Sequence, residues 1–334
     1  MNFKKTALVL AMAGVIAAPM AAQASAGDGA YASIRIGLKM VETNGGFGAA
    51  QGASVDAAGD ATVGSESNTI GGYASRFGFK SETDLGNGMT GFGEYQFSVD
   101  TDSKADTVGN RLAYVGVKGD FGSLSVGREY ATFYDHVVGV NDNPWAGSGY
   151  AMVEYRGRQS NGLTYAGGSG PISYGVTLQM NGVSTNAAGD NEDLDATEIG
   201  ISFDAGFGKF GLAVINFGDE AGVTVDSVTG VALSGVAAGP ATLGFGYQSQ
   251  DKGLLTETSM LVDATFNSAY VHYEALDVDS TNGVGDMTSL AIGYTKSLGP
   301  QTSMWFEYHT VDTDQLVGDG GDSTEFRAIM KYDI

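Results

Sequence analysis

Apolar and polar residues alternate with a period of two along most of the chain. In residues 31–40, Ile34 and Ile36 share one side of the extended backbone, and Ser33 and Arg35 share the other. Successive side chains of a β-strand point to opposite faces, so this alternation predicts strands with one apolar and one polar face. The same pattern recurs in residues 76–80, 90–100 and 325–334.

Sixteen strands are predicted in this way. They cover residues 30–40, 69–82, 89–100, 109–119, 123–129, 160–167, 172–182, 195–205, 208–217, 226–236, 240–250, 256–266, 269–278, 286–297, 302–313 and 323–334. Alternation alone fits a soluble β-sandwich as well as a membrane barrel. However, strands of about ten residues suit a tilted crossing of hydrocarbon, whereas soluble strands are usually nearer five or six. Short turns also alternate with long polar loops, which is typical of outer-membrane barrels.

The predicted fold is therefore all-β, a 16-stranded antiparallel transmembrane β-barrel. An even number of strands brings both ends of the chain to the same side, and a barrel of this width encloses water. The third long loop, residues 130–159, is much longer than an ordinary connection, and such loops are commonly functional. We expect this third loop to fold into the lumen and to narrow it.

The N-terminal residues predict export. Lys4 and Lys5 precede a short apolar run at residues 7–18, and small residues follow at 24–26. This arrangement is that of a secretory signal peptide, because the run is too short for a spanning helix. We predict that residues 1–26 are a cleaved signal peptide and that residues 27–334 form one barrel in the outer membrane.

Composition and charge exclude several other classes. The chain has 39 Asp and Glu against 17 Lys and Arg, a net charge of −22, which has the wrong sign for nucleic-acid binding. Loss of Lys4 and Lys5 with the signal peptide would bring the net charge to −24. The absence of Cys excludes disulfides, thiolate metal sites and a Cys nucleophile. The 52 Gly accompany plentiful aromatic residues, which argues against a disordered linker.

Two groups of opposite charge are candidates for a site in the lumen. The third loop contributes the carboxylates Asp135, Asp142 and Glu154. Alternation places most of the basic residues on inward polar faces, where charge avoids lipid. We call these residues the basic wall: Arg35, Lys39, Arg76, Lys80, Arg111, Arg327 and Lys331. Arg128 shares its side with Leu124 and Val126, so we expect it to point outward, at an interface between subunits.

No catalytic constellation is evident. Residues 206–211 match G-x-G-x-x-G, but they lie between two predicted strands and open no helix, so we interpret them as a tight turn. His136 beside Asp135 has no supporting triad motif, and neither a G-x-S-x-G nor an H-E-x-x-H pattern occurs. We therefore predict that the chain is not an enzyme and requires no cofactor.

Acidic residues near the C-terminus could bind Ca²⁺ weakly on the cell surface. They are Asp312, Asp314, Asp319 and Asp322. Their spacing fits no calcium-loop motif, which favours a solvated acidic loop over an ion site.

Two stretches resemble Gram-negative general diffusion porins. Residues 75–89 (SRFGFKSETDLGNGM) resemble the second-strand hairpin of that family. Residues 111–128 (RLAYVGVKGDFGSLSVGR) resemble its fourth and fifth strands, and residues 133–135 follow where the family begins its constriction loop. The resemblance is looser, although consistent in strand count, from there to the C-terminus.

This resemblance implies a trimer of sixteen-stranded barrels, each with its own pore and with the third loop folded inside. By position, Arg35, Arg76 and Arg111 match the basic side of the family's constriction. Asp142 matches the acidic side, and Asp135 matches the start of the loop. Residues 143–147 (NPWAG) lack the acidic residue that the family often has there, so Glu154 is only a candidate for the second carboxylate.

We predict from these observations a general diffusion porin for small hydrophilic solutes and ions. Its expected partners are two further copies of the chain, outer-membrane lipid and lipopolysaccharide, with no nucleic acid. The acidic net charge motivates a hypothesis of cation preference, against which the basic wall argues. Two alternatives are a channel specific for a substrate such as an oligosaccharide or phosphate, and a secreted all-β adhesin.

Overall fold

The computed structural model describes residues 29–45, 65–101, 108–142, 157–180, 184–185, 191–192, 196–218, 225–251, 256–278, 286–313 and 321–334. The predicted signal peptide at residues 1–26 lies outside them. Within the described residues no helix is both long enough and apolar enough to cross a membrane.

Nearly all of the described chain is strand. The strands are β1 (Gly29–Gly45), β2 (Ser65–Gly72), β3 (Ser75–Gly86), β4 (Met89–Val99), β5 (Val108–Gly119), β6 (Gly122–Tyr130), β7 (Arg158–Ser169), β8 (Ile172–Gln179), β9 (Ser184–Thr185), β10 (Asn191–Glu192), β11 (Ala196–Asp204), β12 (Lys209–Phe217), β13 (Ser227–Ala238), β14 (Ala241–Asp251), β15 (Thr256–Phe266), β16 (Ala269–Val278), β17 (Met287–Ser297), β18 (Thr302–Thr313) and β19 (Gly321–Asp333). One π-helical turn, η1 (Tyr134–Val138), follows β6.

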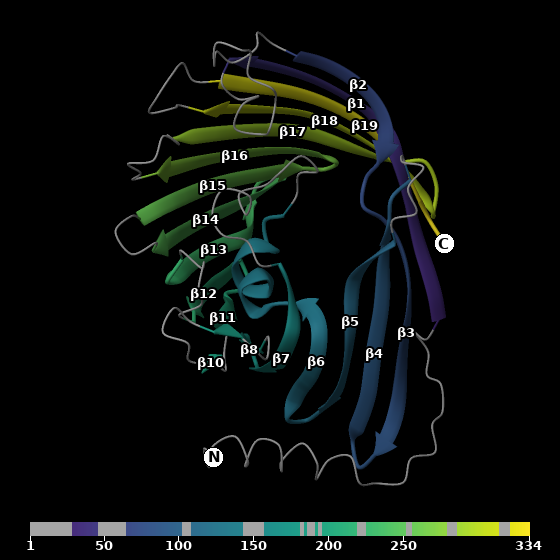
Figure 1. Cartoon of the computed structure of the whole chain (residues 1–334), viewed down its shortest axis with the longest axis vertical. Helices are drawn as coiled ribbons and strands as arrows, with labels where there is room; N and C mark the ends of the chain where they lie inside the picture. Colours follow the sequence, from purple (N-terminus) through teal and green to yellow (C-terminus); the bar gives the residue numbers. More distant parts are fainter. Residues whose placement is uncertain are drawn as a thin grey trace.

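The strands form a closed antiparallel barrel. Consecutive strands pair with each other, except that β2 and β3 both pair with β1. β8 pairs with β11, because β9 and β10 form a small sheet of their own. The ends meet because β1 pairs with β19 from Ser33–Asp333 to Gly45–Gly321, and with β3 through its first residues. β2 and β3 together occupy one position in the wall, which gives the sixteen predicted strands. Figure 1 shows β11–β19 curving around the helical turn, with β3–β6 on the other side.

The second predicted strand, residues 69–82, is in fact longer and is broken. β2 starts at Ser65, and the ladder is interrupted at Tyr73 and Ala74, where Ala74 has a positive φ of 53°. Ser75 replaces ladder bonds at the break. Its Oγ accepts a hydrogen bond from the Arg35 N–H (2.9 Å) and donates one to the Arg35 carbonyl (3.0 Å). An alternating pattern carries no sign of such a break, because the polarity of the residues continues across it.

The two faces of the wall differ as the alternation predicts. On β1, Ile34 and Ile36 are 43% and 41% exposed, whereas Arg35 is 8% exposed. The same contrast recurs around the barrel: Ile292 and Tyr308 point outward, and His309 is buried on the inner side. The outer face is thus an apolar belt suited to hydrocarbon, and the polar side chains line the interior.

Candidate functional site

Four cations of the basic wall line one cavity on the inner side of the barrel. Arg35 of β1, Arg76 and Lys80 of β3 and Lys331 of β19 surround a volume of about 430 Å³, together with Glu94 and Asp333 among others. The Arg35 Nε donates a hydrogen bond to Ser33 Oγ at 2.9 Å. β1 joins these residues because it pairs with β3 on one side and with β19 on the other.

Arg111 joins this group through a β-bulge. On β4, Gln96 pairs with Leu112 and the next residue, Phe97, pairs with Asn110, so Arg111 is an extra residue in β5. A bulge re-aims the side chain that it inserts. The Arg111 Nη2 donates to the Tyr130 hydroxyl at 3.2 Å, and the Arg111 charge acts on both Arg35 and Arg76.

Arg158 belongs to the same group, although the sequence did not nominate it. It begins β7 and pairs with Tyr130 at the end of β6. Its Nη1 donates to the Tyr130 hydroxyl at 3.4 Å, and its guanidinium lies 5.6 Å from the centre of the Tyr130 ring. Residue 158 fell inside the predicted third loop, because the strand begins earlier than the alternation indicates. We call Arg35, Arg76, Arg111 and Arg158 the arginine cluster.

Three further basic-wall residues, Lys39, Arg327 and Lys331, are paired with carboxylates. The Lys39 Nζ lies 2.9 Å from Glu325 Oε1, and the Arg327 guanidinium binds both oxygens of Glu325 at 2.7 and 3.0 Å. The Lys331 Nζ lies 2.8 Å from Asp333 Oδ2. In the part of the chain that the structure describes, Arg76 and Arg111 form no ion pair with a carboxylate, so the positive potential of the wall is concentrated around them.

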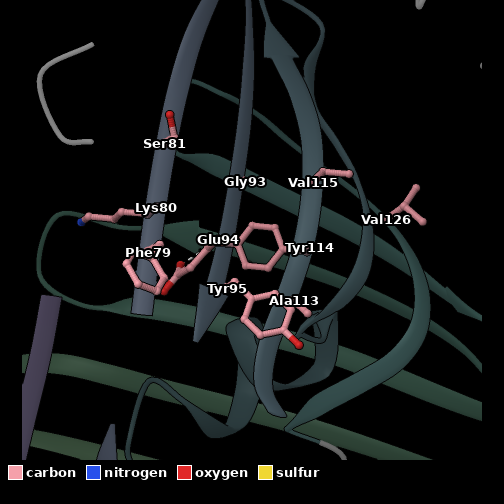
Figure 2. A pocket seen from close by; sticks show the side chains of 10 residues that line it. All are labelled: Phe79, Lys80, Ser81, Gly93, Glu94, Tyr95, Ala113, Tyr114, Val115 and Val126. Atoms are coloured by element: carbon pink, nitrogen blue, oxygen red, sulfur yellow. Dashed lines mark hydrogen bonds between the residues drawn. The ribbon is translucent and has the colours of Figure 1, made fainter. Parts of the chain in front are cut away.

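Glu94 lines the same cavity as Arg35, Arg76 and Lys80 of the basic wall. It accepts hydrogen bonds from the hydroxyl groups of Tyr31 and Tyr114, the latter at 2.9 Å. Figure 2 shows a hollow lined by residues of β3, β4, β5 and β6. Glu94 is among them, together with the exposed apolar residues Phe79, Tyr95, Val115 and Val126. Alternation placed Glu94 on the polar face of its strand, but nothing in the sequence distinguished it from other inward polar residues.

The first part of the third loop packs on the inner face of the opposite wall. We call residues 131–142 the inner segment. Phe133 and Val137 of this segment are buried in an apolar cluster with Ala213, Ile215 and Val228 of β12 and β13. The rest of the loop up to residue 156 lies outside the described residues, and Glu154 with it.

Glycines in the wall make room for this packing. A Cβ added at Gly211 of β12 would lie 1.8 Å from the His136 carbonyl oxygen, and one at Gly200 of β11 would lie 2.5 Å from the His136 ring. Real Cβ atoms essentially never come so close to another heavy atom. The abundance of glycine in the strands therefore has a specific use here, which is to seat the backbone of the inner segment directly on the sheet.

Polar side chains fix the inner segment in place. The Phe133 N–H donates to Glu198 Oε2 at 2.8 Å, and the Asn141 Nδ2 donates to the Phe245 carbonyl at 3.1 Å. The His136 Nδ1 lies 2.6 Å from Ser202 Oγ. Burial lowers the pKa of His136 below its usual value, so the ring is neutral at pH 7. The His136 side chain therefore helps to hold the inner segment against β11.

The acidic candidates that the structure describes lie on this segment. The Asp135 side chain is exposed and lines a cavity of about 430 Å³ with Arg76, Glu129 and Tyr130. Asp142 Oδ2 accepts a hydrogen bond from the Tyr134 hydroxyl at 3.0 Å. The Asp135 carboxylate of the inner segment and the Arg76 guanidinium of the wall thus line the same cavity.

Arg128 also lies at a bulge. On β6, Gly127 pairs with Gly162 and Glu129 with Gln159, which leaves Arg128 outside the ladder with β7, whereas it pairs with Ala113 of β5. Its Nη1 donates to the Arg158 carbonyl at 3.1 Å and to Ser160 Oγ at 2.6 Å. These bonds tie it to the neighbouring strand, and its predicted role between subunits stays a prediction.

The metal prediction concerns residues that are only partly described. Asp312 and Asp322 face each other as partners in β18 and β19, whereas Asp314 and Asp319 lie outside the described residues. Among the residues that the structure describes, no group of three His, Asp or Glu side chains is arranged to hold a metal ion.

Comparisons with known proteins agree with this architecture. The Gram-negative porin family matches residues 6–334. The chain is 25% identical over 303 residues to outer membrane porin F of Escherichia coli (strain K12), covering 75% of this chain and 80% of that one. It is 28% identical over 204 residues to outer membrane porin N of the same organism, where the match spans about half of each protein, 54% and 53%.

A solved structure shows the same fold. The trimer form of OmpT, an outer membrane protein of Vibrio cholerae, superposes with a TM-score of 0.64 at 14% identity, covering 94% of this chain and 100% of that one. Closure of β1 on both β3 and β19, together with the family match, rules out the secreted adhesin alternative. The chain belongs to the Gram-negative porin family, and it forms a passive channel for small hydrophilic solutes and ions in the outer membrane.

Proposed function

We propose that the channel is narrowest where the inner segment faces the arginine cluster. This proposal rests on one cavity, which Arg76 lines from the wall and Asp135 lines from the inner segment. Opposite charges across a narrow aqueous gap produce a transverse electric field, which orients dipolar solutes and disfavours bulky apolar ones. The channel then selects by size and polarity, and no chemical bond changes.

We also propose a preference for cations. The net charge of −22 draws cations toward the mouths of the channel. The basic wall opposes this preference less than its number of charges implies, because Glu325 pairs with both Lys39 and Arg327. Asp333 likewise pairs with Lys331.

Single-channel recording in a salt gradient tests both proposals. Purified, refolded protein in a planar bilayer is expected to give large conductance steps and a reversal potential on the cation side. The double variant Arg76→Gln/Arg111→Gln should shift the reversal potential further toward that of the cation. The matched control is a Lys296→Gln variant, which loses a charge from the exposed side chain on β17.

The outcomes separate the two proposals. A wild-type channel that prefers anions refutes the cation preference. If the double variant has the same reversal potential as the control, the arginine cluster does not lie in the narrow part of the channel. A small conductance that one solute blocks at low concentration favours the substrate-specific alternative.

We propose that three chains assemble in the membrane, each with its own pore. The family resemblance and the trimeric Vibrio cholerae relative support this assembly. The outward apolar belt would contact outer-membrane lipid, lipopolysaccharide or a neighbouring subunit. Conductance that closes in three equal levels, and a gel band that moves to monomer size only on heating, would support the trimer.

We further propose that the channel catalyses no reaction and needs no cofactor. The porins that it resembles are channels, and its buried polar groups hold the inner segment rather than form a nucleophile with a base. The one exception that we allow is weak Ca²⁺ binding near Asp312 and Asp322, where the sequence itself favours a solvated acidic loop. A conductance unchanged by EGTA would argue against a role for Ca²⁺.

A further inference from the structure

Tyr130 lies between the arginine cluster and the inner segment. It is the last residue of β6, and its hydroxyl accepts hydrogen bonds from Arg111 Nη2 on β5 (3.2 Å) and Arg158 Nη1 on β7 (3.4 Å). One aromatic residue therefore links two guanidinium groups of the strands on either side of it. As a neutral acceptor, the phenol holds both cations without cancelling their charge.

The Tyr130 ring continues this link to the inner segment. It stacks on the ring of Tyr134 in η1, with 4.6 Å between the ring centroids and 21° between the planes. The Tyr134 ring in turn lies against Gly139, where an added Cβ would be 2.6 Å from its Cε1 atom. The Tyr134 hydroxyl donates to Asp142 at 3.0 Å. The series Arg158, Tyr130, Tyr134 and Gly139 thus runs unbroken from the wall to the loop.

At the start of the inner segment, the Ala131 N–H donates to the Gly157 carbonyl (3.1 Å) and the Thr132 N–H donates to Thr177 Oγ1 of β8 (3.2 Å). The remaining contacts that hold the segment reach the opposite wall. Glu198, Ser202 and Phe245 lie on β11 and β14, and the apolar cluster lies on β12 and β13. Those contacts place the segment on the wall behind it. The contact between Tyr130 and Tyr134 holds the inner segment at a set distance from the arginine cluster. This distance is the gap between the opposite charges.

We propose that Tyr130 and Tyr134 are positioning residues that set the separation between the arginine cluster and the carboxylates Asp135 and Asp142. This proposal rests on the proposed narrow part of the channel. Stacked rings resist both approach and lateral sliding, so the pair keeps the gap constant while solutes pass. Loss of the stack should release the wall-facing side of the inner segment, whereas loss of the hydroxyl alone should release only the two guanidinium groups.

The experiment combines a spin label with channel recording. The chain has no Cys, so Val140→Cys gives one attachment point on the inner segment, outside the stacked pair. Variants Tyr130→Leu and Tyr130→Phe are compared in this background. The matched control is Tyr31→Leu, which removes another inward tyrosine whose hydrogen-bond partners are Glu94 and Gln96 on β4.

The expected results differ between the variants. Tyr130→Leu should raise the mobility of the label, increase the open-channel current noise and shift the reversal potential. Tyr130→Phe should leave label mobility unchanged and shift the reversal potential toward that of the anion, because Arg111 and Arg158 lose their acceptor. Tyr31→Leu should leave label mobility as in the wild type. If Tyr130→Leu does not refold, Tyr134→Phe keeps the ring and tests the bond to Asp142 through the reversal potential.

Failure of this proposal is distinguishable from failure of the proposed narrow part. If Tyr130→Leu leaves label mobility unchanged while Arg76→Gln/Arg111→Gln shifts the reversal potential, the positioning role is overturned and the narrow part stands. If the label becomes mobile but noise and reversal potential do not change, the inner segment does not control the passage. That result overturns both.

Discussion

Single residues decide how closely the inner segment approaches the wall. At Gly211 the absence of one methyl group lets the His136 carbonyl lie against β12, and Gly230 of β13 does the same for Phe133 and Val137. Sequence alternation predicted the faces of these strands but treated every glycine alike, since a glycine in a strand has several uses. Only the packing of the inner segment on the wall shows which glycines that packing requires.

Gly211→Ala should displace the inner segment. The added Cβ would meet backbone rather than a flexible side chain, and such overpacking typically costs about 1–3 kcal/mol. We expect a lower temperature for loss of the folded form on gels, together with altered conductance. Gly246→Ala is the control, because its Cβ would be 3.4 Å from the nearest atom. Equal behaviour of the two variants would contradict the close packing.

At the scale of strands, much of what the alternation did not predict lies at irregular positions of the backbone. The sixteen strands were confirmed, including the weakest, residues 226–236, whose poor alternation reflects a register shift in β13 between Leu233 and Val236. The bulges at Arg111 and Arg128, and the break before Ser75, interrupt the period of two. A period of two does not reveal these irregularities, because an extra or left-handed residue changes the backbone pairing without a matching change in residue polarity.

The break between β2 and β3 gives a prediction at the same scale. Ser75→Ala removes the acceptor of the Arg35 N–H, and an unsatisfied buried donor costs about 1–3 kcal/mol. The Arg35 carbonyl keeps one bond, from the Tyr73 N–H at 3.0 Å. Thermal melting in detergent should show a lower midpoint for Ser75→Ala than for Ser81→Ala, an exposed position on the same strand. Identical midpoints would show that water satisfies the donor.

For the whole molecule, the sequence predicted the barrel, its location and its passive transport, and these predictions were confirmed. Strand parity and closure, which are global properties, nominated Arg35, Arg76 and Arg111, and the fold places these three residues near one another. Their role in the passage stays a prediction. The sequence could not show that Glu325 pairs with Lys39 and Arg327, or that Arg158 joins the cluster. Those depend on side-chain geometry at the seam and at the loop.

Net charge gives a prediction that only the whole molecule can test. If cation preference arises from the acidic charge around the mouths, salt must screen it, since the Debye length falls from about 10 Å at 0.1 M to about 3 Å at 1 M. Reversal potentials measured at a fixed concentration ratio should therefore show a weaker preference at high salt. A preference independent of salt would place its origin inside the passage instead, at groups such as Asp135.

The seam between β1 and β19 joins the first strand of the barrel to the last. Ala32 and Ile334 exchange two backbone hydrogen bonds, with Ile334 N–H to Ala32 at 2.9 Å and Ala32 N–H to Ile334 at 3.1 Å. β1 precedes β19 in the chain, so the edge of β1 stays unpaired until β19 has been made. Until export is complete, both edges of the sheet are open to strands of other molecules. Assembly of this protein therefore competes with aggregation until β19 pairs with β1 and closes both edges.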